Sequence, residues 1–216
     1  MDLSPVEIRV LGSLLEKQRT TPDAYPLTLN GLRLACNQST NREPVLELDE
    51  DEIRAALDRL RRRGFTRLAS GHGSRAPKFR QLVDEALGLG RDELALLTVL
   101  MLRGPQTPGE LKQRTERLHD FADLGAVGAT LESLIERELV ARLGRRPGQK
   151  EERYAQLLGE EPEGATAAAP PTATASEEPP TAAPSEAPPA EPGPGLADRV
   201  ARLEERVAAL EAAAER

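Results

Sequence analysis

The fold of this chain is decided by residues 52–65, EIRAALDRLRRRGF, and by residues 126–139, AVGATLESLIEREL. In the first stretch Ile53, Leu57 and Leu60 are spaced four and three residues apart, which is typical of one buried helix face. A displacement of 74 residues carries this pattern onto Val127, Leu131 and Leu134. Each stretch leads into a short apolar segment, so the sequence predicts a helix followed by a strand, present twice.

The repeat extends upstream, with a different displacement. The apolar set Val10, Leu11, Leu14 and Leu15 matches, 86 residues later, the set Leu96, Leu97, Leu100 and Met101. Two helix starts are marked by a hydroxyl residue, a proline and a glutamate three residues on, at Ser4 to Glu7 and at Thr107 to Glu110. This spacing is that of a capping box with proline at the first helical position.

Each repeat ends in a pair of short strands. Residues 65–69 and 78–82 flank Gly71-His72-Gly73, and residues 139–143 and 153–157 flank Pro147-Gly148. Apolar runs separated by glycine or proline predict hairpins. Three helices followed by a hairpin form the winged-helix layout. We therefore predict a mainly α fold with small β-hairpins, in tandem winged-helix domains at residues 1–84 and 85–158.

The composition changes after the second hairpin. Residues 159–195 hold ten prolines and seven glutamates, and this composition predicts a disordered, acidic, Pro/Ala-rich linker. Residues 196–216 regain a spacing of four and three, which predicts a short coiled-coil helix that self-associates as a parallel dimer. The predicted seam consists of Leu196, Val200, Leu203, Val207 and Leu210. The alternatives are a helix that docks on the body of the chain or binds a partner helix.

The charge of the chain is divided unevenly. The net charge is −7, but residues 1–158 carry 25 basic and 24 acidic side chains, and residues 159–216 carry 4 and 12. The excess of acidic residues therefore lies in the tail, residues 159–216. It does not exclude nucleic acid as a partner of the body, residues 1–158. A single cysteine excludes a disulfide framework. No apolar run is long enough to span a membrane, and no signal peptide is recognisable, so we expect a cytoplasmic protein.

The sequence offers no group suited to catalysis. The two histidines, His72 and His119, have no neighbour that suggests a catalytic triad, and Cys36 lies in an apolar helical stretch where a buried thiol is expected. One cysteine and two scattered histidines do not supply a zinc site, and no phosphate-binding glycine motif is present. We expect no catalytic residues, metal, cofactor or small-molecule substrate, and no enzymatic activity.

A basic stretch gives the candidate site. Residues 59–80 contain eight cations and no acid, and they cover the end of the third helix and the first hairpin. Clustered cations of this kind favour phosphate contact. The candidate nucleic-acid-binding residues are Arg62, Arg63, Arg67, Arg75, Lys78 and Arg80. The alternative is a solvated basic face whose helical part complements the helix dipole.

The start of the third helix argues against reading of base edges. Residues 49–52 are all acidic and would repel the phosphates of a groove. We therefore expect backbone contacts to duplex DNA with weak sequence preference, in a regulatory or architectural role. The alternative function is a protein–protein scaffold that uses the winged-helix faces and the terminal helix.

Three stretches carry a resemblance to a known family. They are YPLTLNGLRLACNQSTNREPV at 25–45, ERLHDFADLGAVGATLESLIER at 116–137 and RRPGQKEERYAQLL at 145–158. Over residues 4–158 the chain resembles the YceH-like family of bacterial proteins. The resemblance implies two winged-helix domains and no established activity. The coiled-coil-like end is similar to that of some members, whereas the linker is longer here.

Overall fold

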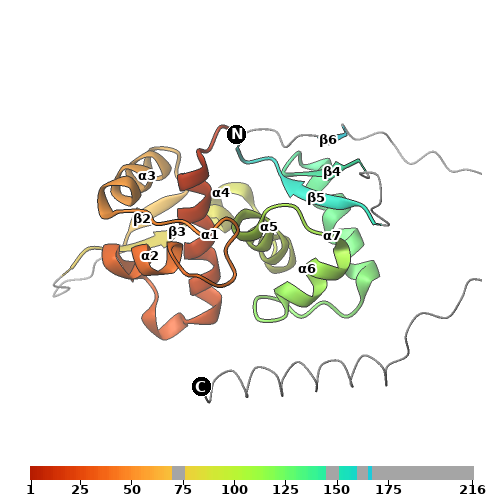
Figure 1. Ribbon diagram of the computed structural model, residues 1–216, viewed down its shortest axis with the longest axis horizontal. Coiled ribbons are helices and arrows are strands. Elements are labelled where there is room, and N and C mark those ends of the chain that lie inside the picture. The colour runs from red at the N-terminus through yellow and green to blue at the C-terminus, as the bar shows by residue number, and fades with distance from the viewer. Residues whose placement is uncertain (70–75, 145–150, 160–164, 167–216) are drawn as a thin grey trace, which may run out of the picture. The chain divides into compact units, whose positions relative to one another are not determined.

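The computed structural model describes residues 1–69, 76–144, 151–159 and 165–166 and is mainly helical, with two small antiparallel sheets (Figure 1). The first repeat consists of α1 (Pro5–Thr20), the 3-10 helix η1 (Pro22–Ala24), β1 (Leu27–Thr28), α2 (Leu29–Cys36), α3 (Glu50–Arg62), β2 (Thr66–Leu68) and β3 (Lys78–Gln81). After the short α4 (Val83–Leu87), the second consists of α5 (Arg91–Arg103), α6 (Pro108–Thr115), α7 (Leu124–Glu136), β4 (Val140–Leu143), β5 (Arg153–Gln156) and β6 (Ala165–Thr166).

The two repeats follow the predicted displacements. Both ends of α7 lie 74 residues after those of α3, and α5 begins 86 residues after α1. The first sheet has the order β1-β3-β2, and in the second repeat an isolated bridge between Gln106 and Tyr154 takes the place of the β1–β3 pairing. The repeat inferred from apolar spacing is thus confirmed as a structural repeat.

Both predicted helix starts are confirmed. The Ser4 hydroxyl accepts a hydrogen bond from the Glu7 amide at 3.3 Å, and the Thr107 hydroxyl accepts one from the Glu110 amide at 3.2 Å. In return, the Glu7 and Glu110 carboxylates accept hydrogen bonds from the backbone amides of Ser4 and Thr107. These pairs satisfy amides that have no partner inside the helix.

The core is built around α1 and α5, which pack against each other. Both helices are buried on nearly every side over their middle turns, and their buried residues include the polar side chains of Arg9, Ser13 and Thr98. Gly12 lets them approach closely, because a Cβ atom there would lie 3.0 Å from Leu102 Cδ2. The predicted helical apolar positions of both repeats join one continuous core.

Backbone hydrogen bonds also join the repeats. The Leu3 amide donates to the Leu158 carbonyl at 2.9 Å, and the Glu43 amide donates to the Leu102 carbonyl at 2.8 Å. Both repeats belong to one compact unit, and the predicted boundary between residues 84 and 85 lies within α4.

Several predictions concern residues that the structure does not describe. The coiled-coil seam, Arg75, both hairpin turns and most of the predicted linker lie outside the described residues. At the start of the linker, the structure adds a strand that the sequence did not predict, since Ala165 and Thr166 pair with Leu143 and Arg142 of β4. None of the helices in the described ranges is long and apolar enough to cross a bilayer.

Candidate functional site

The candidate site lies on the first repeat, where the C-terminal half of α3 meets the β2–β3 hairpin. We call this the α3–hairpin surface and define it by Arg62, Arg63, Arg67, Lys78 and Arg80 together with the groove beside them. The helix is held by Ile53, Ala56, Leu57 and Leu60, which are buried in the core. Its opposite side is exposed and carries the charges.

A groove of about 230 Å³ separates α3 from the hairpin. Its lining includes the apolar side chains of Leu57, Leu68, Pro77 and Phe79. Its charged lining residues are Arg54, Asp58, Arg61 and Arg67. Leu68 is 47% exposed, so part of the groove wall is uncovered apolar surface. Arg54 and Arg61 were not predicted as groove residues, because the groove exists only when the hairpin folds against α3.

Two of the predicted phosphate-binding residues are open. Arg62 and Arg67 are exposed, and neither side chain has an ion pair or hydrogen bond among the residues that the structure describes. Arg67 is paired in register with Arg80 on the neighbouring strand. Residues directly opposite on adjacent antiparallel strands lie on the same face of the sheet, so both guanidinium groups belong to one face of the hairpin.

The other predicted residues are engaged or half-buried. Arg80 donates to Glu85 at 2.8 Å, and Arg63 donates to the backbone carbonyl of Asp2 at 3.0 Å. Lys78 is half-buried at the start of β3, in register with Thr28 of β1. The predicted residues therefore form two groups. Arg62 and Arg67 have open guanidinium groups, whereas Arg63, Lys78 and Arg80 are engaged in contacts or half-buried.

The Arg63 contact has a counterpart in the second repeat. Arg137, which lies 74 residues later, donates to the carbonyls of Leu87 and Gly88 and forms an ion pair with Glu93 at 3.1 Å. Gly88 lies 86 residues after Asp2. This equivalence indicates that Arg63 ties the end of α3 to the segment before α1.

Neighbouring arginines are also paired with carboxylates. Arg59 lies 3.3 Å from Glu7, and Arg61 lies 3.3 Å from Asp58. Burial would raise the pKa of Glu7, but hydrogen bonds from Ser4 and the charge of Arg59 lower it on balance. The eight-cation stretch is therefore less positive in the fold than in the sequence.

The acidic start of α3 has a structural explanation. The Asp49 carboxylate accepts a hydrogen bond from the Glu52 amide at 2.8 Å, and the Glu52 carboxylate accepts one from the Asp49 amide at 2.9 Å. Asp51 forms an ion pair with Arg54 at 3.0 Å. These carboxylates stabilise the helix N-terminus and leave it unsuited to phosphate.

The second hairpin differs from the first in electrostatics. Arg142 contacts Glu132, lies 3.5 Å from Glu152, and stacks 5.7 Å from the ring centre of Tyr154. Burial would lower the pKa of Arg142, but these neighbours raise it on balance. Arg153 lies 3.5 Å from Glu110. The cations described on this hairpin thus have carboxylate partners, whereas Arg145, Arg146 and Lys150 lie outside the described residues.

The cysteine thiol is shielded. Cys36 is fully buried at the end of α2, and burial raises its pKa to about 11 despite nearby Arg42 and Arg9. At neutral pH the group is a protonated thiol without solvent access, which is the form least suited to nucleophilic attack.

Comparison with known proteins gives consistent matches over most of the chain. Residues 3–149 match the family described as a protein of unknown function, DUF480. A UPF0502 protein from Solibacter usitatus is 47% identical over 99% of this chain and 95% of its own length. A UPF0502 protein from Geotalea daltonii is 54% identical over 78% of each chain. The UPF0502 protein YceH of Escherichia fergusonii is 48% identical over 80% of this chain and 85% of its own.

Proposed function

The chain belongs to the DUF480 family, and we propose that it is a non-enzymatic tandem winged-helix protein that associates with duplex DNA through the α3–hairpin surface. The element order supports the winged-helix assignment, since each repeat runs through a helix, a strand or bridge, two helices and two paired strands. In proteins of this class the third helix and the hairpin face the nucleic acid.

The observation that carries the proposal is the pair of open arginines. Arg62 at the end of α3 and Arg67 on β2 are exposed and lack a carboxylate partner within the described ranges. Guanidinium groups match phosphate geometry and release counterions when they bind nucleic acid. Arg67 lies in register with Arg80, whose charge is balanced by Glu85, so Arg67 and Arg62 are the groups that offer a phosphate an open guanidinium.

The same surface sets the expected binding mode. The acidic start of α3 keeps phosphates away from the part of the helix that reads base edges in helix-turn-helix proteins. Contacts then fall on the backbone, which gives affinity with weak sequence preference and suits a regulatory or architectural role. The ion-paired cations of the second hairpin contribute little.

Fluorescence anisotropy with a labelled duplex tests the proposal. The combined substitutions Arg62→Glu and Arg67→Glu should weaken binding at least tenfold at low salt. They should also make the slope of log affinity against log salt shallower by about two units, about one per lost contact. The matched control carries Arg33→Glu and Arg91→Glu, which change the net charge equally on α2 and at the start of α5. An equal loss in the control, or no salt-sensitive binding by the wild type, contradicts the proposal.

The groove favours a second candidate function. Leu68 and Phe79 give it apolar surface that DNA does not need but a peptide would cover. In this alternative the protein is a scaffold that binds a protein partner in the groove and self-associates through residues 196–216. Capture of a stoichiometric partner that survives nuclease treatment and is lost on Leu68→Glu would favour it over DNA association.

A further inference from the structure

A second and larger pocket lies where the two repeats meet. It has a volume of about 420 Å³, within the range usual for small-molecule sites. The first repeat contributes Glu16 and Thr20 of α1 and Asn41 from the segment after α2. The second repeat contributes the rest of the lining from α5, α6 and the residues that follow α6.

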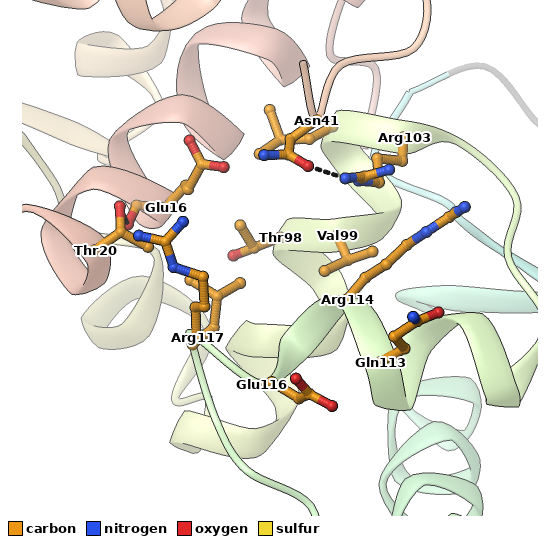
Figure 2. A pocket seen from close by; sticks show the side chains of 12 residues that line it. Glu16, Thr20, Asn41, Thr98, Val99, Arg103, Gln113, Arg114, Glu116 and Arg117 are labelled. Atoms are coloured by element: carbon orange, nitrogen blue, oxygen red, sulfur yellow. Dashed lines mark hydrogen bonds between the residues drawn. The ribbon is translucent and has the colours of Figure 1, made fainter.

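Three arginines surround this pocket. Figure 2 shows Arg103 and Arg114 on one side and Arg117 on the other, with Thr98 and Val99 of α5 between them. Arg103 comes from the last residue of α5, Arg114 from α6 and Arg117 from just beyond α6. Arginines that lie close together repel one another, so apolar packing alone does not explain why three of them line this pocket.

The positive charge is incompletely balanced. Among the residues described, the Arg103 side chain donates only to the neutral amide oxygen of Asn41, and Arg117 has no ion pair. Arg114 lies 3.4 Å from Glu110, but Glu110 also lies 3.5 Å from Arg153. One carboxylate is thus shared by two guanidinium groups. Burial lowers the pKa of Arg103, and the charges of Arg114 and Arg42 lower it further, whereas the carboxylates of Glu16 and Glu43 oppose this shift without reversing it.

The two carboxylates in the lining offset only part of the charge of the three arginines. Glu16 is held by Arg42, with Nη2 of Arg42 2.6 Å from Oε2 of Glu16, and by Lys17 at 3.4 Å. Glu116 is exposed at the edge of the pocket, and Figure 2 shows it below Arg114 and Gln113. Val99, Leu102 and Leu118 supply apolar lining beside the charged groups.

We propose that this pocket binds a small organic anion, through a phosphate or carboxylate group held by Arg103, Arg114 and Arg117. Paired guanidinium groups bind both oxyanions bidentately, and the polar and apolar lining would hold the remainder of the molecule. The occupant contacts both repeats, so it stabilises their arrangement. This proposal does not depend on DNA association.

Isothermal titration calorimetry of the full chain at low salt tests the site, with inorganic pyrophosphate and citrate as probes of the two oxyanion types. We expect saturable one-site binding of at least one probe. Arg103→Gln and Arg117→Gln should each weaken it about tenfold or more, as charge-assisted hydrogen bonds are lost. The preferred probe identifies the phosphate or carboxylate class.

The controls separate this pocket from the basic surface of the first repeat. Arg33→Gln removes an exposed charge on α2 and should leave binding unchanged. Arg117 is exposed, so Arg117→Gln should keep the melting temperature of the unliganded protein while reducing the rise that the probe causes. No saturable binding of either probe overturns the proposal. So does binding that survives the pocket variants but is lost on Arg67→Gln.

Discussion

At the residue scale, a buried ion pair fixes the segment between α2 and α3. The Arg42 side chain is fully buried and makes two hydrogen bonds to the Glu16 carboxylate, at 2.6 and 3.1 Å. It also donates to the carbonyl of Ala35 at 2.9 Å, at the end of α2. Burial would raise the pKa of Glu16, but the hydrogen bonds and charge of Arg42, with Lys17, lower it on balance.

This lowered pKa predicts an acid-sensitive contribution to stability. A carboxyl group with a depressed pKa in the folded state stabilises the protein above its ordinary pKa of about 4.3, and the contribution is lost as pH falls through the lower folded value. Glu16→Gln should cost about 3–5 kcal/mol at pH 7, because it leaves Arg42 buried without its counter-charge. It should also flatten the fall in the free energy of unfolding on acidification from about pH 5 to pH 3.

Urea unfolding at a series of pH values measures both effects. Glu47→Gln, an exposed position without an ion pair among the residues described, is the control and should follow the wild-type curve. If the unfolding free energies of Glu16→Gln and the wild type run parallel across the acidic range, Glu16 does not carry this contribution.

At the scale of elements, the two third helices end alike but with different residues. After α3 the chain turns at Gly64, with a φ of 78°, and after α7 it turns at Glu138, with a φ of 56°. In each case the next amide donates back into the helix at 2.9 Å, from Phe65 to Leu60 and from Leu139 to Leu134. The left-handed turn directs the following apolar residue into the core.

These equivalent turns predict substitutions of opposite sign. Gly64→Ala should lower the free energy of unfolding by about 1 kcal/mol, because an L side chain is strained at this φ. A Cβ atom at Gly64 would meet nothing within 4 Å, so steric clash with neighbours does not enter. Glu138→Gly should raise it by a few tenths to about 1 kcal/mol, as the same strain is relieved. Denaturant unfolding at neutral pH measures both, and changes of the same sign would refute the equivalence of the two turns.

The predictable elements are those set by nearby residues. The capping boxes of α1 and α6 and the buried positions of α3 and α7 follow from spacings of three and four residues, and all are confirmed. The strands β1 and β6 were not predicted, because each has two residues and is fixed by a partner strand rather than by its own composition. Burial of Cys36 followed from its apolar surroundings and is confirmed.

For the candidate site, the sequence predicted the cluster of basic residues but not which of them have carboxylate partners. Which cations stay open depends on carboxylates distant in sequence, such as Glu7 for Arg59, and no local pattern reports such pairs. The pocket between the repeats left no signal in the sequence, since Arg103, Arg114 and Arg117 gather there only when α5 and α6 pack beside α1. Residue spacings within a repeat predict the helices and strands of that repeat, whereas the residues that meet at the junction depend on how the two repeats pack.

At the scale of the whole molecule, charge is separated between the body and the tail. Residues 159–216 carry 12 acidic and 4 basic side chains, and the body is close to neutral, with an open basic surface on the first repeat. An acidic segment tethered to such a surface competes with DNA at a high effective concentration. We therefore predict that the linker weakens DNA binding by the α3–hairpin surface.

Replacement of the seven linker glutamates by glutamine tests this without shortening the chain. It preserves residues 196–216, so any self-association through the helix predicted there is retained, whereas deletion of residues 159–216 removes both the charge and this predicted segment. Affinity for duplex DNA at low salt should rise severalfold in the glutamine variant, and the difference should vanish at about 1 M salt, where the screening length falls to about 3 Å. Glutamine substitutions at Glu204, Glu205 and Glu211 of the terminal segment are the control for charge beyond the linker. Equal affinities for the glutamine variant and the wild type at low salt would show that the tail does not screen the basic surface.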